Sequence, residues 1–268
     1  MKIYKFWTTE KQKIIIDGQP QEITCYGGSN ISLEDARRVA QEKARKIERK
    51  IAGEKYLFED YEAEIREELL QTVDDHSVIT RNRYGARVLN VERLMILDID
   101  KPKSAGGGLA GLFKKKDTRP PKEQIFEMVK SLATTKYTDL AFRLYETYQG
   151  ARVIVLGRDF DPRDSATNKM MDEFNCDPLY TLLCIKQGCY RARLTPKPSR
   201  MRFRGYKVKY PREGDDSEFQ RWVSEYESVS RNFSVCKFIG QAGVDHSMPE
   251  VVRLHDDVTG VGYPQRLA

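Results

Sequence analysis

Two aspartates at the end of a short apolar run are the residues best suited to chemistry in this sequence. The apolar residues 94–97 lead into Asp98-Ile99-Asp100, and Pro102 follows shortly afterwards. A run of this composition predicts a buried strand whose C-terminal end reaches the surface, because regular structure tends to end ahead of a proline. Side chains at positions i and i+2 of a strand share a face, so Asp98 and Asp100 are predicted to point the same way.

Two carboxylates on one face repel each other unless a cation lies between them. Hard divalent cations take oxygen ligands, and one or two carboxylates together with substrate phosphates commonly complete their shell. We therefore expect Asp98 and Asp100 to bind Mg²⁺ or Mn²⁺ and to be the catalytic residues if the protein is an enzyme. The alternative is a strand end that carries two solvated acids, because the D-x-D pattern is short.

A basic segment over residues 191–209 is the second feature that could do chemistry, since it contains eight basic residues and no acid. Because Arg200, Arg202 and Arg204 alternate with two apolar residues, the segment predicts a strand that is basic on one face. Such a face repels itself unless it meets an anion, and the phosphates of nucleotides or nucleic acid are the obvious choice. The alternative is an edge strand that its charge protects from aggregation. The candidate phosphate-binding residues are Arg191, Arg193, Lys197, Arg200, Arg202 and Arg204.

A predicted turn ahead of the D-x-D strand carries further planar donors. Residues 77–90 predict two strands joined near positions 82–85. Arg81 and Arg83, together with Tyr84, could contact phosphates and stack on bases. Arginine and tyrosine are also common surface residues at the tip of a hairpin, so both interpretations stay open.

The elements before this turn follow from hydrophobic patterning. Residues 2–26 predict short strands that form a hairpin around a turn at 17–20. Ser32 and Asp35 form a capping signature ahead of an amphipathic helix of about 18 residues. Residues 57–73 fit both helical spacing and alternation, and we predict a helix there.

The elements after the D-x-D strand predict a hairpin beside it. Residues 103–121, rich in glycine, lysine and proline, predict a flexible insertion. A helix is predicted over 122–137, and two strands around a glycine turn over 141–156. A right-handed crossover would place this hairpin next to the D-x-D strand, so that Arg152 could approach the carboxylates. Further helices are predicted over 165–174, 177–185 and 218–229, a further strand over 234–240, and possible metal ligands at His255-Asp256-Asp257.

The composition bounds the class of protein. The 268 residues include 46 basic and 40 acidic residues, for a net charge of +6, and mean hydropathy is -0.63. These values predict a soluble globular protein. The sequence has no apolar run long enough to span a membrane and no signal-peptide core, so we expect a cytoplasmic protein. Five cysteines without a disulfide-like framework are typical of a reducing compartment.

The spacing of these motifs resembles the core of archaeo-eukaryotic primase-polymerase proteins. Residues 97–102, a helix, and residues 147–153 match a family pattern in which a D-x-D strand, often followed by proline, precedes a strand with a Gly-x-His step. The resemblance implies an RRM-like catalytic module that uses divalent metals to join nucleotides. It implies a metal role for Asp98 and Asp100, and a triphosphate contact for Arg152, which stands where the family has histidine. Candidates for a third metal carboxylate are Asp245, Asp256 and Asp257. Through residues 80–86 and 191–198 the chain also resembles a set of bacterial proteins, a likeness that implies no function.

We therefore predict an α+β fold, with helices packed on an RRM-like or primase-like sheet in one composite domain. An N-terminal α/β subregion, with a β-hairpin and a helix, would span residues 1–90, and the primase-like core residues 91–268. The leading hypothesis is a metal-dependent nucleotidyltransferase-like protein, of the primase-polymerase type, that acts on or binds nucleotides or nucleic acid.

Two other functions are open. One is a non-catalytic nucleic-acid-binding protein with a degenerate primase-like fold. The other is a haloacid-dehalogenase-like phosphatase with Asp98 as nucleophile and Asp100 as acid, although that family expects Thr or Val where Pro102 stands.

Overall fold

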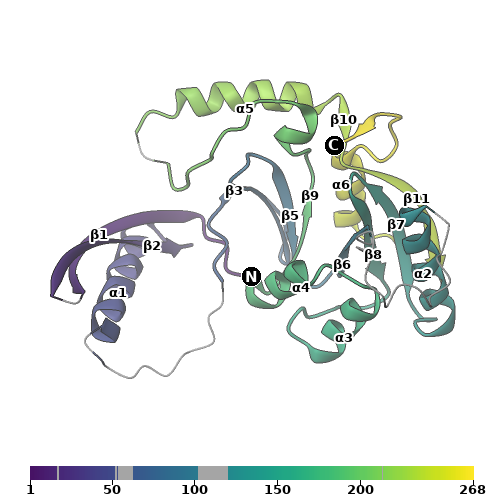
Figure 1. The fold of residues 1–268 in the computed structure, drawn as a ribbon, viewed down its shortest axis with the longest axis horizontal. Helices are drawn as coiled ribbons and strands as arrows, with labels where there is room; N and C mark the ends of the chain where they lie inside the picture. Colours follow the sequence, from purple (N-terminus) through teal and green to yellow (C-terminus); the bar gives the residue numbers. More distant parts are fainter. Residues whose placement is uncertain (17, 52, 54–62, 102–119, 213) are drawn as a thin grey trace, which may run out of the picture.

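The strand that carries the two aspartates lies at the edge of a four-stranded antiparallel sheet (Figure 1). This strand, β6 (Ile96–Asp100), pairs with β8 (Gly150–Leu156). Beyond β8 the sheet continues through β7 (Ala141–Thr147) to β11 (Cys236–Gly243), and we call it the site sheet. The computed structural model describes every residue except 17, 52, 54–62, 102–119 and 213.

Helix α2 (Pro121–Thr135) follows β6 in the described chain and packs on the site sheet. Its buried residues Ile125, Phe126, Val129 and Ala133 recur every three or four positions, which places them on one face of the helix. Because β8 lies between β6 and β7, these elements form a split βαβ unit. The hairpin of β7 and β8 is therefore next to the D-x-D strand, as the sequence predicts.

A second four-stranded antiparallel sheet lies beside the first (Figure 1). Its order is β3 (Glu68–Asp74), β4 (Ser77–Arg81), β5 (Arg87–Val91) and β9 (Tyr190–Arg193). The boundary predicted after residue 90 falls within β5, which pairs with β9 from the later part of the chain.

The N-terminal hairpin and helix project away from the two sheets (Figure 1). Strands β1 (Phe6–Ile16) and β2 (Gln19–Ser29) pair along their whole length, and α1 (Leu33–Ile51) packs against both. The helix approaches closely because Gly27 has no side chain: a Cβ there would lie 1.9 Å from the Ala36 carbonyl oxygen. The predicted cap is present, since the Ser32 hydroxyl accepts a hydrogen bond from the Asp35 backbone N–H.

The other described elements cover the sheets. They are α3 (Ser165–Glu173), α4 (Pro178–Gln187), a 3₁₀ helix (Pro198–Met201), α5 (Ser217–Ser230), α6 (Glu250–Thr259) and the short parallel pair β10 (Phe233–Ser234) and β12 (Arg266–Leu267). None of the described helices is long and apolar enough to cross a membrane.

The α+β class is confirmed, but two predicted elements are wrong. Part of the predicted helix over 57–73 is the strand β3, because pairing with β4 settles a pattern that fits both periods. The predicted basic strand over 200–204 begins instead as a 3₁₀ helix, and Arg202 has a left-handed backbone with φ of 57°. The prolines at 196 and 198 lack backbone N–H groups and fix φ, which disfavours a paired strand. The predicted insertion over 103–121 lies outside the described residues apart from its last two, of which Pro121 begins α2.

Candidate functional site

Asp98 and Asp100 lie on the same face of β6 and are both exposed, whereas Leu97 and Ile99 between them are buried. This alternation is the one that the sequence predicts, and we call the two aspartates the acid pair. The register of the site sheet places Arg152 directly opposite Asp98, and Gly150 directly opposite Asp100. The first cation next to the acid pair therefore comes from β8.

Gly150 is required by the close approach of β8 to β6. A Cβ at this position would lie 2.0 Å from the Ile99 carbonyl oxygen, which is far inside van der Waals contact. The turn before it is tied to the end of β6, since the Lys101 backbone N–H donates to the Gln149 carbonyl oxygen at 3.2 Å. The glycine of the sequence motif thus fixes the spacing beside Asp100.

Four basic side chains from three elements surround the acid pair, and we call them the cation group. They are Arg152 on β8, Arg193 at the end of β9, and Lys197 and Arg200 at the start and within the 3₁₀ helix. Asp98 keeps contact with solvent, but the protein packed around it removes part of its hydration and raises its pKa, and the positive charges of Arg152 and Arg193 oppose this shift. Burial lowers the pKa of Lys197 and of Arg200, and the negative charges of the acid pair oppose both shifts.

The acid pair and the cation group face each other without touching. Among the described residues, no ion pair within 4.0 Å joins any of these cations to an acid. The charges of the acid pair and the cation group therefore act on each other without direct ion pairs. Negative oxygens would complement the cation group, and a bound cation would complement the acid pair.

Arg193 carries the clearest sign of a missing partner. Its Nη1 atom is buried and has no hydrogen-bond acceptor. Burial lowers its pKa to about 10, and the positive charges of Arg200 and Arg152 act in the same direction. A buried donor without a partner costs about 1–3 kcal/mol, so an anionic oxygen at this position would be bound favourably.

The side chain of Arg152 is oriented by a hydrogen bond to the buried His255. Its Nη1 atom donates to the Arg193 carbonyl oxygen at 3.1 Å and lies 2.9 Å from Nε2 of His255. A guanidinium can only donate, so Nε2 must be the acceptor and Nδ1 must carry the proton. That Nδ1 lies 2.9 Å from Asp256 Oδ1. Burial lowers the pKa of His255 to about 4, which keeps the ring neutral near pH 7.

Asp256 is fully engaged in the same buried network. Its carboxylate accepts hydrogen bonds from Tyr145 Oη at 2.8 Å and from Arg143 Nη2 at 2.7 Å, in addition to His255. The prediction that His255 and Asp256 supply metal ligands is therefore wrong. The chain uses them to orient Arg152, a role that depends on how α6 packs on the site sheet and that leaves no local signal in the sequence.

No third metal ligand joins the acid pair in the part of the chain that the structure describes, where no group of three His, Cys, Asp or Glu residues is placed to hold a metal ion. Asp177 is a further acid close to Asp98: its backbone N–H donates to the Asp98 carbonyl oxygen at 2.8 Å, and its charge helps to raise the pKa of Asp98. Its carboxylate caps α4 by accepting from the Tyr180 backbone N–H. Of the predicted candidates, Asp245 accepts from Gln241 and Asp257 lies exposed on α6.

Five other predicted phosphate-binding residues lie outside the cation group. Three of them have acidic partners: Arg191 donates to Glu67 and also to Asn90, Arg204 pairs with Glu225, and Arg81 is buried between Glu68 and Glu227. Arg83 lies over the ring of Tyr84, and Arg202 ends the 3₁₀ helix. The ion pairs of Arg191, Arg81 and Arg204 give these side chains structural partners. A uniform basic face is consequently absent from the described part of this segment.

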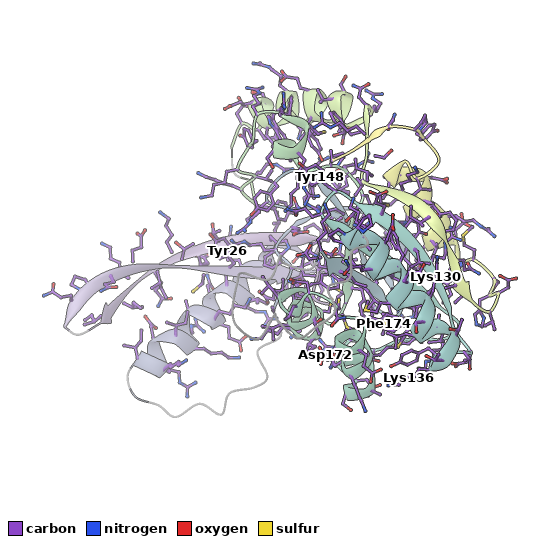
Figure 2. All side chains as sticks on the ribbon, turned by 45° about the vertical axis from the view of Figure 1, so that its right-hand side comes forward. Tyr26, Lys130, Lys136, Tyr148, Asp172 and Phe174 are labelled. Carbon is purple, nitrogen blue, oxygen red and sulfur yellow. The ribbon has the colours of Figure 1, made fainter. Side chains whose placement is uncertain are left out.

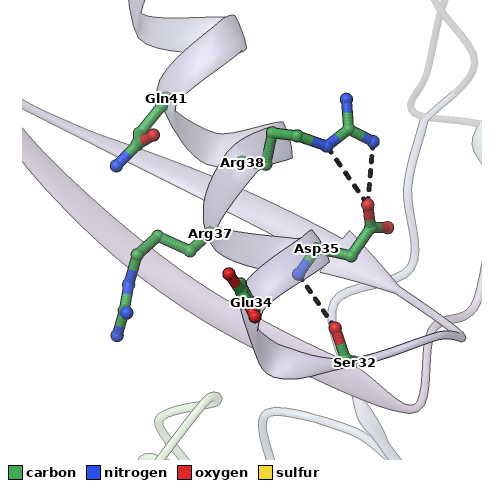
Figure 3. Close-up of a pocket in the computed structure, with 6 residues that line it drawn as sticks. All are labelled: Ser32, Glu34, Asp35, Arg37, Arg38 and Gln41. Atoms are coloured by element: carbon green, nitrogen blue, oxygen red, sulfur yellow. Dashed lines mark hydrogen bonds and ion pairs between the residues drawn. The ribbon is translucent and has the colours of Figure 1, made fainter.

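Two hollows occur in the described part of the chain, one away from the acid pair and one beside Asp100. One is on α1 and is lined by Ser32, Glu34, Asp35, Arg37, Arg38 and Gln41 (Figure 3). Its charges pair with one another, as Arg38 donates to Asp35 at 2.8 Å. The other borders Asp100 on the side of α2 and is lined by Ile99, Asp100, Gln124, Ile125, Met128 and Asn175. Neither of these two hollows is lined by a member of the cation group.

Comparison of the chain with models of protein families, with curated proteins and with solved structures found no match.

Proposed function

We propose that this protein is a metal-dependent, nucleotidyltransferase-like protein that binds a nucleoside triphosphate between the acid pair and the cation group. The observation that carries the proposal is the convergence of two carboxylates and four basic side chains without ion pairs between them, with a buried Arg193 donor that lacks a partner. Four positive charges against two negative ones favour an anion. A triphosphate with its divalent cation matches both signs of charge.

The acid pair fits a hard divalent cation. Its donors are carboxylate oxygens alone, which suit Mg²⁺ or Mn²⁺, and Mg²⁺ commonly takes its remaining ligands from substrate phosphates and water. Asp98 is crowded by the negative charges of Asp100 and Asp177, both of which contribute to its raised pKa. Asp98 and Asp100 would hold the cation, which would supply charge neutralisation and polarisation of the reacting phosphate.

The cation group would hold the phosphate oxygens. Arg193 offers its unpartnered Nη1 donor, and Arg152 is held in one orientation by His255. A planar guanidinium can donate two parallel hydrogen bonds to a phosphate, which also fixes its orientation. Lys197 and Arg200 add two further positive charges on which both members of the acid pair act.

Calorimetric titration with ATP tests the proposal directly. With Mg²⁺ or Mn²⁺ present we expect saturable binding, and chelation of the metal should weaken it. The double variant Asp98→Asn/Asp100→Asn should lose the metal dependence, whereas Asp257→Asn, which removes an exposed acid from α6, should bind as the parent does. Equal metal dependence in the acid-pair variant and the parent would refute the assignment.

A reaction assay separates binding from turnover. Primer extension and de novo synthesis with Mn²⁺ should give product with the parent protein and none with the acid-pair variant. Equal product from both would show that the acid pair has no catalytic role.

A second function is favoured by one observation. The described residues include no third ligand for the acid pair, as expected of a nucleic-acid-binding protein that does not catalyse. That function predicts strongly salt-dependent binding that EDTA does not change, and no product in the extension assay.

A further inference from the structure

The turn between β7 and β8 brings an aromatic ring close to Asp100, at the C-terminal end of β6. Tyr148 and Gln149 form this turn, directly before Gly150, which is paired with Asp100. Tyr148 lies on the side of the site sheet that faces α5 (Figure 2). Its side chain is 41% exposed although its neighbours along β8 are buried.

Arg200 fixes one face of this ring. Its guanidinium carbon lies 4.7 Å from the ring centroid of Tyr148, and its Nη2 donates to Gln149 Oε1 at 2.7 Å. The hydrogen bond and the ring contact together restrict both side chains. Arg200 also belongs to the cation group, so the ring is directly linked to the proposed phosphate site.

Exposed aromatic rings beside basic residues are the means by which proteins bind single strands. Bases stack on the rings while the backbone follows the positive charges, and arginine adds a cation–π contribution. We propose that Tyr148, backed by Arg200 and Gln149, is the stacking platform for one base of a single-stranded nucleic acid. The inference rests on the proposed function, because the phosphates next to that base would be bound by Arg200 and Lys197.

The chain contains a matched control for this pair. Tyr84, at the turn between β4 and β5, is 47% exposed, and the guanidinium of Arg83 lies 4.9 Å from its ring centroid. The same two residue types thus occur in the same contact, but no described hydrogen bond, ion pair or ring contact joins Arg83 or Tyr84 to the acid pair or the cation group. The base-stacking role considered for this turn from the sequence therefore gains no support from the structure, and Tyr84 serves as the control. A general effect of removing an exposed tyrosine would appear equally at both positions.

Fluorescence anisotropy with two labelled oligonucleotides tests the platform. One is an oligothymidylate and the other an abasic strand of the same length, each titrated with the parent, Tyr148→Ala, Tyr148→Phe and Tyr84→Ala. Stacking of one base contributes about 1–3 kcal/mol, which corresponds to about a 5- to 150-fold loss of affinity. We expect Tyr148→Ala to lose this factor on the oligothymidylate only, and Tyr148→Phe and Tyr84→Ala to bind as the parent does.

Three results would overturn the inference: unchanged affinity of Tyr148→Ala for the oligothymidylate, an equal loss on the abasic strand, or failure of the parent to bind either strand. Thermal unfolding of each variant shows whether a loss reflects misfolding. Titration with inorganic tripolyphosphate and Mg²⁺ tests the phosphate site separately from the stacking platform. If the parent and Tyr148→Ala bind tripolyphosphate equally well, but the parent does not distinguish the oligothymidylate from the abasic strand, the platform is refuted and the proposed phosphate site is not.

Discussion

At the scale of single residues, the contact between Arg152 and His255 is the most informative. The neutral ring accepts from the guanidinium on one side and donates to Asp256 on the other, in a site with no exposure to solvent. Replacement by leucine would remove one hydrogen bond from each neighbour, because Arg152 would still donate to the Arg193 carbonyl oxygen and Asp256 would still accept from Tyr145 and Arg143. Each lost bond to a charged group costs about 1.5–3 kcal/mol.

The choice of substitution separates orientation from stability. We expect His255→Gln to retain tripolyphosphate binding better than His255→Leu, because a glutamine carbonyl oxygen can still accept from Arg152. Urea unfolding gives the stability of each variant, and calorimetry gives its affinity. Equal affinity of His255→Leu and the parent would show that the histidine does not position Arg152 for binding.

The same histidine predicts a dependence of stability on pH. Its pKa is lowered from 6.5 to about 4 in the folded protein. Between these values the unfolded chain binds a proton that the folded chain does not, so stability is complete above pH 6.5 and falls as the pH drops towards 4. The difference corresponds to about 3 kcal/mol. Urea unfolding at pH 7 and pH 4.5 should show that the free energy of unfolding falls less for His255→Gln than for the parent. Equal decreases would contradict the assignment of this pH dependence to His255.

At the scale of elements, the close pairing of β6 and β8 depends on Gly150. We expect Gly150→Ala to destabilise the fold by about 1–3 kcal/mol, because the new Cβ must displace backbone rather than a flexible side chain. Gly205→Ala is the control, since a Cβ there would meet no atom within 4 Å. The free energies of unfolding in urea compare the two, and a neutral effect of Gly150→Ala would show that the strands can separate without cost.

The sequence predicts the elements of the site better than their contacts. The shared face of Asp98 and Asp100 follows from local alternation, and the position of Arg152 follows from the order of strands and helix. The predicted basic strand is wrong: alternation suggests a strand over 200–204, but Pro198 begins a 3₁₀ helix that extends to Met201, and Arg202 follows with a left-handed backbone. His255 could not be assigned its role, since that role depends on the packing of α6 against residues more than a hundred positions earlier.

At the scale of the whole molecule, the basic residues of the 191–209 segment do not form one continuous basic face. Arg200 belongs to the cation group, whereas Arg204 is exposed and paired with Glu225. For single-stranded nucleic acid, each phosphate contact contributes about 0.7 to the slope of log K against log salt concentration. Arg200→Gln should therefore reduce the slope by about 0.7, and Arg204→Gln, with the same change in net charge, should leave it unchanged. Equal slopes for the two variants would mean that binding responds to net charge alone.

The pairing of β5 with β9 has a consequence for synthesis of the chain. About a hundred residues separate the two strands, so β5 leaves the ribosome long before its partner exists. Its residues Val88, Leu89 and Val91 become buried in the finished protein, and until then β5 has an open hydrogen-bonding edge. Nascent chains that stop before Tyr190 would expose this edge and lack Arg193, Lys197 and Arg200, so they should associate through β5 without being able to bind a phosphate.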